Sequence, residues 1–357
     1  MPVNKSTVNT RVKKLRNLFS QYDIDALLIQ KDVNITYLTG FPAEESWLFV
    51  TRKKLYYITD FRYILEVKKG LKGVVIKEYT KSAFDTLFEI AKQDKVKRLG
   101  LDENHLTVAQ FKRLKKAMPK SLQLKTANGL VENLRMIKDS QEIKLTREAL
   151  RLHHKALKQL KRLIKPGKSE RDIYEHLEKF IKAHKVGFSF SPIVASGPNA
   201  ALPHAKITDR KFKANDVVLV DMGIDVKGYK SDLTRMFFLG KIPELVKTVH
   251  THVDTAKNLA IETIRSGISV AKVDQQARKY LEKNKLSKYF GHALGHGVGL
   301  EIHENPRLSQ KSREILEEGM IVTVEPGVYL PNKFGIRLEE MVLVTKSGCE
   351  ILSDNIH

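Results

Sequence analysis

Short apolar runs alternate with amphipathic stretches along the first third of the chain. Helical periodicity covers two of the amphipathic stretches, at 10–21 and 81–93. A third helix is expected to begin at Thr107, which is spaced as a capping box with Gln110, and to stop near Pro119. The apolar runs have the length of buried strands, and they lie at 26–29, 48–50, 56–58, 74–76 and 99–101. This alternation predicts an α/β domain, which we assign to residues 1–130.

The pattern changes to long amphipathic helices from Asp139 onward. Asp139 and Glu142 are spaced as a capping box before a helix that Pro166 and Gly167 end. A second helix follows, beginning at Ser169 and closed by Gly187. Two strands come next, at 217–221 and 236–239. A second helix pair follows at 243–265 and 270–284, and two final strands lie at 320–324 and 337–344. A helix pair followed by strands thus occurs twice, which predicts one α+β domain over residues 131–357.

Bulk properties limit the class of protein. A chain of 357 residues exceeds one typical core, which agrees with two domains. The basic N-terminus has no apolar core, and no apolar run approaches the roughly 18 residues of a membrane span. We therefore expect a soluble, unexported, cytoplasmic protein. The single cysteine, Cys349, excludes an intramolecular disulfide, and without a Cys/His signature around it we interpret it as a small residue near a strand end.

The net charge of +22 is the one unusual bulk property, and it suits either solvated helix faces or an anionic partner. The basic residues are spread over several helices rather than gathered in one tail, for example Lys155, Lys158, Lys161, Arg162, Arg278, Lys279, Lys283 and Lys285. This distribution is typical of solvated faces. We therefore expect no nucleic-acid partner, although the charge is compatible with acidic substrates.

Two aspartates flank a predicted turn. Asp221 ends the apolar run 217–220, and Asp232 follows after a turn at 226–228. A carboxylate at the end of a buried strand is costly without a compensating cation. A strand, turn and strand of this length can fold back as a hairpin and bring the two carboxylates together. Two aspartates around a hairpin are also common as surface residues, so this pair alone does not decide between the two readings.

A glycine-rich stretch, 291–306, contains three histidines, His292, His296 and His303. Glycines suit a backbone that passes close to a ligand or metal, and neutral imidazole is the commonest nitrogen ligand. A lone histidine would carry no such argument. Three of them within this short stretch indicate a site.

Two further acidic residues lie in apolar strand patterns. Glu325 and Glu339 are separated by a turn at 331–335, so pairing of their strands would align a second carboxylate pair, whereas Glu340 points to the opposite face and is expected to be solvated. Four carboxylates and one neutral histidine carry a charge that two divalent ions neutralise. Oxygen-rich ligation with one imidazole favours Mn(II) or Co(II), with Fe(II) or Zn(II) also compatible. Two such ions about 3.5 to 4 Å apart can hold a hydroxide for hydrolysis.

These motifs resemble the metallopeptidase family of methionine aminopeptidase, aminopeptidase P and prolidase, called pita-bread enzymes. The resemblance covers essentially the whole chain and includes DMGID, SDLTR, GHGVGLEIHENP, TVEPGVY, GIRLEE and the helix start LRMIKDSQEI. The stretch SPIVASGPNAALPH resembles the proline-specific branch, and DALLIQKDVNITYLTGF resembles the creatinase-type N-terminal domain of that branch. The resemblance therefore implies a creatinase-like α/β domain followed by a pita-bread catalytic domain.

The resemblance also implies roles for individual residues. The metals would be held by Asp221, Asp232, His296, Glu325 and Glu339, with Asp232 and Glu339 bridging them and Glu325 acting also as general base. The carbonyl and the tetrahedral intermediate would be steadied by His204 and His303, with His292 and Arg337 supporting the centre. The proline pocket would be lined by Phe190 and Ile302, each of which could equally be plain core, and Arg307 would meet the carboxylate of a dipeptide.

The implied substrate is a peptide with proline second, either an Xaa-Pro dipeptide, as for a prolidase, or a longer peptide, as for aminopeptidase P. Arg307 favours the dipeptidase. A non-catalytic pita-bread binding protein is a third alternative, but such relatives typically lack metal ligands, and a creatinase-like amidinohydrolase works without the metals. The resemblance also implies a homodimer.

Overall fold

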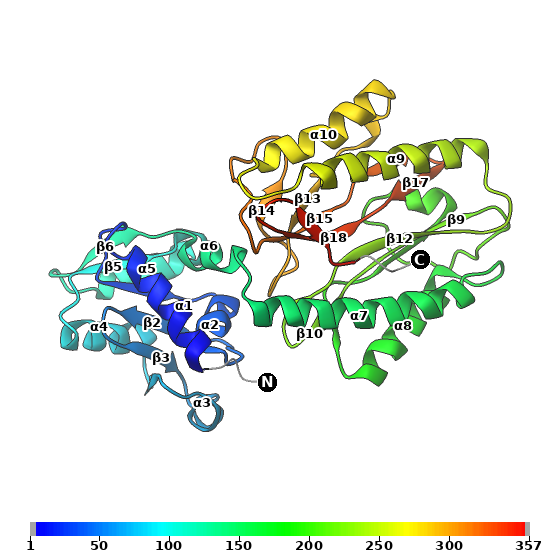
Figure 1. Cartoon of the computed structure of the whole chain (residues 1–357). Helices are drawn as coiled ribbons and strands as arrows, with labels where there is room; N and C mark the ends of the chain where they lie inside the picture. The colour runs from blue at the N-terminus through cyan, green and yellow to red at the C-terminus, as the bar shows by residue number, and fades with distance from the viewer. Residues whose placement is uncertain (1–4, 354–357) are drawn as a thin grey trace. The chain divides into compact units, whose positions relative to one another are not determined.

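The computed structural model describes residues 5–353. Its N-terminal part is a six-stranded sheet covered by helices (Figure 1). The chain divides into two units, Met1–Arg135 and Met136–His357. The sheet of the first unit has the order β4-β3-β2-β1-β5-β6. Its strands are β1 (Ala26–Ile29), β2 (Trp47–Thr51), β3 (Leu55–Thr59), β4 (Val75–Glu78), β5 (Arg98–Leu101) and β6 (Gln123–Thr126). The three consecutive strands β1 to β3 pair antiparallel, and the other neighbours pair parallel.

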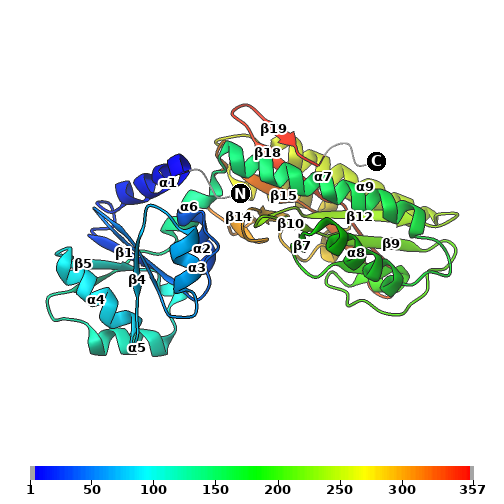
Figure 2. The ribbon, with the colours of Figure 1, turned by 90° about the horizontal axis from the view of Figure 1, so that it is seen from below.

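Helices lie on both sides of this sheet, and α2 and α4 are on opposite sides in Figure 2. The helices are α1 (Lys5–Leu18), α2 (Asp32–Thr39), α3 (Ile64–Gly70), α4 (Ala83–Gln93), α5 (Val108–Ala117) and α6 (Leu130–Met136), with a 3-10 turn η1 (Glu103–His105). One face of the sheet buries Leu28, Phe49 and Tyr56 in a core cluster with Leu87 of α4. The capping box of Thr107 is confirmed at the start of α5. The sequence patterns missed the short elements α2, α3, α6 and β6.

Four long helices dominate the second unit: α7 (Ser140–Leu163), α8 (Glu170–His184), α9 (Glu244–Thr263) and α10 (Val270–Lys283). The predicted capping boxes that begin α7 and α8 are both confirmed. The predicted end of α8 is wrong in detail. Lys185 adopts the left-handed conformation that ends the helix, with φ of 52°, and Gly187 already begins strand β7 (Gly187–Phe188).

The strands of the second unit form several small sheets, with the orders β11-β10-β7, β12-β9-β8, β14-β13-β15-β18-β19 and β16-β17. They are β8 (Ile193–Ser196), β9 (Val217–Met222), β10 (Ile224–Val226), β11 (Tyr229–Lys230), β12 (Leu233–Phe238), β13 (Gly295–Gly297), β14 (Glu304–Leu308), β15 (Ile321–Val324), β16 (Gly327–Leu330), β17 (Phe334–Arg337), β18 (Glu340–Val344) and β19 (Cys349–Ile351). The predicted single strand over 337–344 is two strands, because Leu338 and Glu339 leave the ladder between β17 and β18. Two 3-10 turns, η2 (Gly197–Ala201) and η3 (Ser287–Tyr289), complete the unit.

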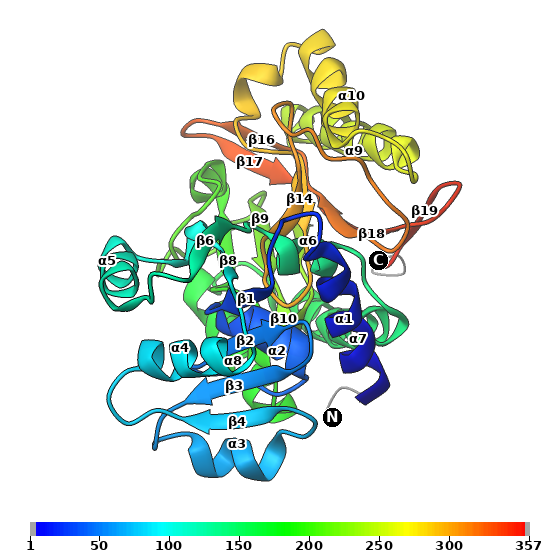
Figure 3. The same ribbon diagram turned by 90° about the vertical axis from the view of Figure 1, so that its left-hand side faces the viewer.

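Strands of the second unit lie between two helix layers, with α9 and α10 on one side and α7 and α8 on the other (Figure 1). Strand alternation explains this arrangement. Val217 and Leu219 of β9 join the core cluster of α9 and α10, whereas Val218 and Val220 join that of α7 and α8. Figure 3 shows α9 and α10 packed along each other. Because both faces are covered, β9 is apolar throughout until it reaches Asp221.

The basic helix residues named above are exposed, with the exception of Arg278. Cys349 lies at the start of β19, as predicted, and burial raises the pKa of its thiol. Within residues 5–353, no helix combines the length and the apolar character that crossing a membrane requires.

Candidate metal centre

Three acidic side chains from separate segments meet at one point: Asp221 at the end of β9, Asp232 before β12, and Glu339 between β17 and β18. One oxygen from each lies within 4.8 Å of the other two. The predicted hairpin is confirmed, since β9 and β12 pair antiparallel with Asp221 opposite Thr234. Between them β10 and β11 extend the hairpin to a turn at Lys227 and Gly228, where φ is 54° and 92°. The fold therefore brings distant carboxylates together.

Glu325 and His296 complete this cluster. Glu325 directly follows β15, whose last residue, Val324, pairs with Glu340, so Glu325 and Glu339 flank the same end of the ladder. His296 lies in β13, which pairs with β15. Its Nε2 is 3.5 Å from Asp232 Oδ2 and 3.3 Å from Glu325 Oε1. All five residues that the sequence proposed as metal ligands are thus neighbours.

Burial and mutual repulsion disfavour the charged forms of these carboxyl groups. Burial, and then the neighbouring carboxylates Glu339 and Asp221, raise the pKa of Asp232 well above its usual value. Burial, followed by Glu325 and Asp221, does the same to the pKa of Glu339. Burial also raises the pKa of Asp221, although Arg337 acts in the opposite direction. Such a cluster is stable in its charged form only with added positive charge.

Glu325 and His296 behave differently from the other three. Burial by itself would raise the pKa of Glu325, but the hydrogen bond to His296 holds it below its usual value. Burial likewise opposes protonation of His296, but Glu325 raises the pKa of the imidazole. The pair therefore favours opposite charges.

The donor set fits divalent cations. In the described part of the chain, Asp221 Oδ1 and Glu339 Oε1 are buried and have no hydrogen-bond partner. An orphaned carboxylate oxygen that is buried beside other carboxylates is a free metal donor. Carboxylate oxygens with one imidazole suit divalent ions such as Mn(II) or Co(II) rather than a thiolate-binding metal.

Buried Arg337 donates hydrogen bonds to the cluster and to the residues around it. Its NH2 donates to Asp221 Oδ2, its NH1 to Tyr329 Oη at 2.8 Å and to the Pro203 carbonyl at 3.2 Å, and its Nε to Thr234 Oγ1 at 2.9 Å. Thr234 in turn donates to Glu339 Oε2 at 2.8 Å. The guanidinium therefore orients one oxygen of Asp221 directly and, through Thr234, one oxygen of Glu339.

The three further histidines lie around this cluster. The ring of His303 is 4.4 Å from the ring of His296, and burial, followed by His296, lowers its pKa. His204 also acts on the pKa of His303, and it follows Pro203, which Arg337 holds. His292 Nε2 lies 3.0 Å from Tyr329 Oη, and burial lowers the pKa of its imidazole. His204 and His303 are both exposed, so both side chains can be reached by a ligand.

The residues proposed for the substrate pocket have different surroundings. Arg307 lies opposite His296 in the ladder of β13 and β14, and it is exposed. It takes part in none of the ion pairs found among residues 5–353. Ile302 packs against a core cluster that includes Leu233, so the core role left open by the sequence is present. Phe190 is half-buried.

Glu340 is not solvated, contrary to the prediction. Its side chain is 16% exposed, with Arg235 at 2.9 Å and Lys257 at 3.7 Å. The prediction was wrong because Arg235 of β12 and Lys257 of α9, which are distant in the sequence, both contact Glu340. The sequence pattern also missed Tyr329 and Thr234, which link Arg337 to the surrounding residues. The only feature of the sequence that could have indicated Tyr329 is its hydroxyl group, which is polar and lies in an otherwise apolar strand.

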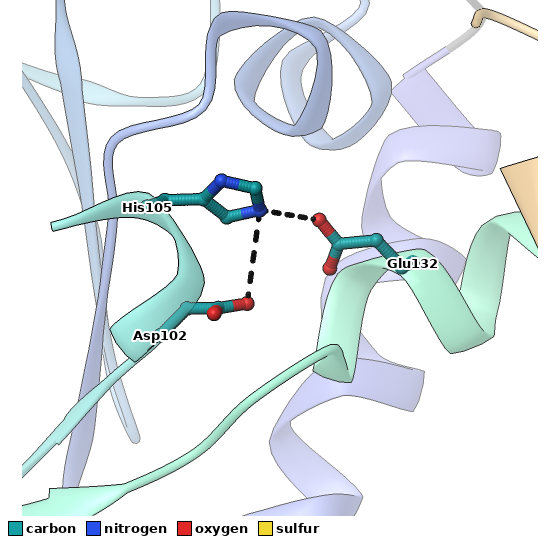
Figure 4. A group of neighbouring side chains, drawn as sticks. All are labelled: Asp102, His105 and Glu132. Carbon is teal, nitrogen blue, oxygen red and sulfur yellow. Dashed lines mark hydrogen bonds and ion pairs between the residues drawn. The ribbon is translucent and has the colours of Figure 1, made fainter. Parts of the chain in front are cut away.

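A second group of possible ligands lies in the first unit. Asp102, His105 and Glu132 offer atoms within 4.8 Å of one another, and Figure 4 shows the imidazole directed toward both carboxylates. Within residues 5–353, Glu132 Oε2 is buried without a hydrogen-bond partner, whereas the other three carboxylate oxygens of this group accept hydrogen bonds. The two oxygens of Asp102 accept the N–H groups of Asn104 and Gly129, and Glu132 Oε1 accepts from His105 at 3.1 Å and from Asn34 at 2.7 Å. This group is a structural connection between η1 and α6.

Family models match both parts of the chain. The description "Metallopeptidase family M24" applies to residues 144–346, which include every residue of the cluster. The description "Creatinase/Prolidase N-terminal domain" applies to residues 11–137. The chain belongs to metallopeptidase family M24. The creatinase-like domain and the pita-bread domain expected from the sequence are therefore confirmed.

Proteins described as Xaa-Pro dipeptidases or X-Pro aminopeptidases resemble this chain over nearly its whole length. An Xaa-Pro dipeptidase of Pyrococcus horikoshii is 33% identical over 97% of this chain and 97% of its own. The structure of an Xaa-Pro dipeptidase from Bacillus anthracis matches with a TM-score of 0.93 and 33% identity, covering 98% of each chain. The structure of an X-Pro aminopeptidase from Thermotoga maritima matches with a TM-score of 0.85 and 32% identity, covering 94% of this chain and 97% of the other.

Proposed function

We propose that this M24 protein is a prolidase, which uses two divalent metal ions to hydrolyse the peptide bond before proline in Xaa-Pro dipeptides. The observation that carries the proposal is the group of three buried carboxylates, two of them with an orphaned oxygen, together with partly buried Glu325 and His296. Similarity to Xaa-Pro dipeptidases along almost the entire chain supports the substrate class. From the donor set we propose Mn(II) or Co(II). From the family resemblance we propose a cytoplasmic homodimer.

Each residue of the centre has a task in this reaction. Asp221, Asp232, His296, Glu325 and Glu339 would hold the ions, which when bound supply a Lewis acid and an ionised water. Glu325 accepts the proton of the attacking water and delivers it to the proline nitrogen as the bond breaks. His204 and His303 donate hydrogen bonds to the oxygen that becomes negative in the tetrahedral intermediate. Arg337 keeps Asp221 oriented throughout.

Recognition of the substrate would involve its free carboxylate and its proline ring. The exposed side chain of Arg307, which lies opposite His296 in the ladder, would bind the free carboxylate of a dipeptide. Phe190 and Ile302 would supply apolar contacts to the proline ring. A dedicated site is needed because proline has no N–H to donate when a peptide binds as an added strand.

Substrate length decides between the prolidase and an aminopeptidase P. Initial rates with Mn(II) would be compared for an Xaa-Pro dipeptide, the same dipeptide with a C-terminal amide, and the tripeptide that extends it. We expect cleavage to be confined to the free dipeptide. Arg307→Met should raise the KM for the dipeptide by about tenfold to a hundredfold, which is the loss of one charge-assisted contact.

Arg313→Met is the matched control, since Arg313 is also exposed and lies in the same part of the chain. Its kinetics should equal those of the wild type. Efficient cleavage of the amide and the tripeptide would instead make the protein an aminopeptidase P, the class of one similar structure. Metal binding without any cleavage would favour a non-catalytic binding protein.

A further inference from the structure

An ion pair between a buried aspartate and a partly buried arginine lies on α10 and includes none of the five proposed metal ligands. Asp274 is fully buried, and Arg278 is one helical turn further along. Arg278 Nε is 2.7 Å from Asp274 Oδ2, and its NH2 is 3.1 Å from Asp274 Oδ1. Burying such a pair costs desolvation energy, so it stabilises a protein only where further hydrogen bonds complete it. The partners of those hydrogen bonds indicate what the pair does.

The pair holds the backbone of segment 290–294. Arg278 NH1 donates to the Phe290 carbonyl at 3.2 Å, and NH2 donates to the His292 carbonyl. The guanidinium carbon also lies 4.3 Å from the centre of the Phe290 ring. Asp274 Oδ1 accepts the N–H of Leu294 at 3.2 Å. Segment 290–294 leads directly into β13, which carries His296.

One connection runs from this segment to Glu325. The carbonyl of Leu294, whose N–H is held by Asp274, accepts the backbone N–H of Glu325 at 2.8 Å. The position of the Glu325 backbone therefore depends on the position of Leu294. Asp274 is thus two hydrogen bonds away from the residue proposed as general base.

A second connection runs to Asp221. His292, whose carbonyl is held by Arg278, has its Nε2 3.0 Å from Tyr329 Oη. Arg337 NH1 donates to the same Tyr329 oxygen at 2.8 Å, and Arg337 NH2 donates to Asp221. The two connections share one origin and end on two different carboxylates of the cluster.

We propose that Asp274 and Arg278 are positioning residues, which set the geometry of the metal centre through segment 290–294 without touching metal or substrate. This inference rests on the proposed function only as far as metal binding, since it requires no proline substrate. Removal of Arg278 should let the segment shift. Glu325 and Asp221 would then hold the ions less well and in an altered arrangement.

The test compares Arg278→Met with Arg210→Met. Arg210 forms a two-point pair with Asp216 at 2.7 and 3.0 Å, and its side chain is 21% exposed, against 22% for Arg278. Asp216 precedes the first residue of β9, at the opposite end of that strand from Asp221. The control therefore removes a similar ion pair that has no connection to segment 290–294. Both variants should lower the melting temperature.

Three readouts separate positioning from general stability: the visible absorption spectrum of the Co(II)-loaded protein, its Co(II) affinity in competition with a chelator, and kcat per bound ion. For Arg278→Met we expect an altered spectrum, Co(II) affinity weaker by about tenfold to a hundredfold, and kcat lower by a similar factor with little change in KM. For Arg210→Met we expect wild-type values of all three. Arg278→Lys, which keeps the charge, should be intermediate.

A wild-type Co(II) spectrum and kcat in folded Arg278→Met would overturn the proposal, whatever its melting temperature. If that variant does not fold, Asp274→Asn and Arg278→Lys supply the same comparison, because each keeps part of the hydrogen-bond pattern. If the wild type cleaves no Xaa-Pro peptide, the proposed substrate is wrong, but the spectrum and the affinity still decide whether this pair positions the metal centre.

Discussion

The carboxylate of Glu339 has two oxygens in different surroundings. Oε2 accepts a hydrogen bond from Thr234, whereas Oε1 is buried and meets no donor within residues 5–353. Glu340, the next residue, is satisfied by Arg235, Lys257 and Ser353. The charged forms of these two adjacent glutamates are therefore stabilised to different extents by the protein itself. The charged form of Glu339 needs an added cation, whereas the carboxylate of Glu340 is already paired with Arg235 and Lys257.

This contrast predicts opposite effects of neutralising the two residues. In the metal-free protein, Glu339→Gln should raise the free energy of unfolding, because the amide avoids the cost of a carboxyl group whose pKa is raised by burial and by Glu325 and Asp221. The same change should abolish most of the stabilisation by Mn(II), which for the wild type is about 2.7 kcal/mol for each bound ion at a hundredfold excess over its Kd. It should also lower activity more than about a hundredfold. Denaturant titrations with and without metal measure the first two effects.

Glu340→Gln is the control for that comparison. It should destabilise the metal-free protein, because Arg235 loses its charged partner, and it should keep the stabilisation by metal. If Glu339→Gln destabilised the metal-free protein and still responded fully to Mn(II), Glu339 would not be a ligand.

His153 predicts an acid sensitivity of the fold. It is fully buried on α7, with Nδ1 3.2 Å from Ser231 Oγ, and burial, followed by the charge of Arg235, lowers its pKa well below 6.5. The folded protein therefore excludes a proton that the unfolded chain accepts below about pH 6.5. This contribution to stability is complete above that pH and is lost as the pH falls, by about 1.4 kcal/mol per unit.

The measurement is the free energy of unfolding of the wild type and of His153→Gln at about pH 7.5 and about pH 5.5. Wild-type stability should fall more than that of the variant, by about 1.4 kcal/mol. Equal losses in the two proteins would show that His153 does not bind the missing proton.

Individual site residues can be predicted from the sequence by residue type and local pattern. Asp221, Glu325 and Glu339 are conspicuous because each ends or interrupts an apolar strand pattern, and Asp232 because it follows a predicted turn. The structure groups Asp221, Asp232 and Glu339, and it places Asp232 and Glu325 beside His296. The expectations for Glu340 and Arg278 were wrong for a shared reason. Each depends on a segment far away in the chain, α9 for Glu340 and 290–294 for Arg278, which local periodicity does not contain.

Strand β13 shows why the glycines of the GHG motif are needed. A Cβ on Gly295 would lie 2.0 Å from the Thr323 carbonyl oxygen, and one on Gly297 would lie 2.3 Å from that of Asn305. The sequence suggested close approach to a ligand. The atoms that leave no room are instead backbone atoms of neighbouring segments, which hold His296 between β14 and β15.

Gly295→Ala should therefore destabilise the second unit by about 1 to 3 kcal/mol or prevent its folding, because the backbone cannot yield as a flexible side chain does. Gly291→Ala, in the same glycine-rich stretch, is the control, since a Cβ there would meet nothing within 4 Å. Thermal unfolding of both variants measures the difference. Similar melting temperatures for the two would contradict the packing described for β13.

Long helices can be predicted from the sequence more completely than short helices and strand boundaries. The long helices α7 to α10 were predicted because amphipathic periodicity persists over several turns, and α7 and α8 also begin with capping boxes. Short helices such as α2 and α3 contain too few turns for such a signal. The break between β17 and β18 was missed because apolar residues continue through it, and only the three-dimensional position of Glu339 separates the two strands.

The whole molecule combines a net charge of +22 with an acidic centre. Basic residues such as Lys155, Lys158 and Lys279 lie on exposed helix faces, whereas Asp221, Asp232 and Glu339 are buried. The local field at the centre therefore attracts cations in spite of the overall sign. Exposed Arg307, which pairs with His296 in the ladder, adds a positive group for the proposed contact with the carboxylate of a dipeptide.

Metal and substrate together test the central claim most directly. Metal-free protein would be titrated with Mn(II) while the release of free proline from an Xaa-Pro dipeptide is followed, with bound metal measured in parallel. We predict no release without metal, activity that rises with bound Mn(II), and saturation at two ions per chain. Release that persists in excess chelator, or two bound ions without any release of proline, would contradict the assignment of this centre as a dinuclear prolidase site.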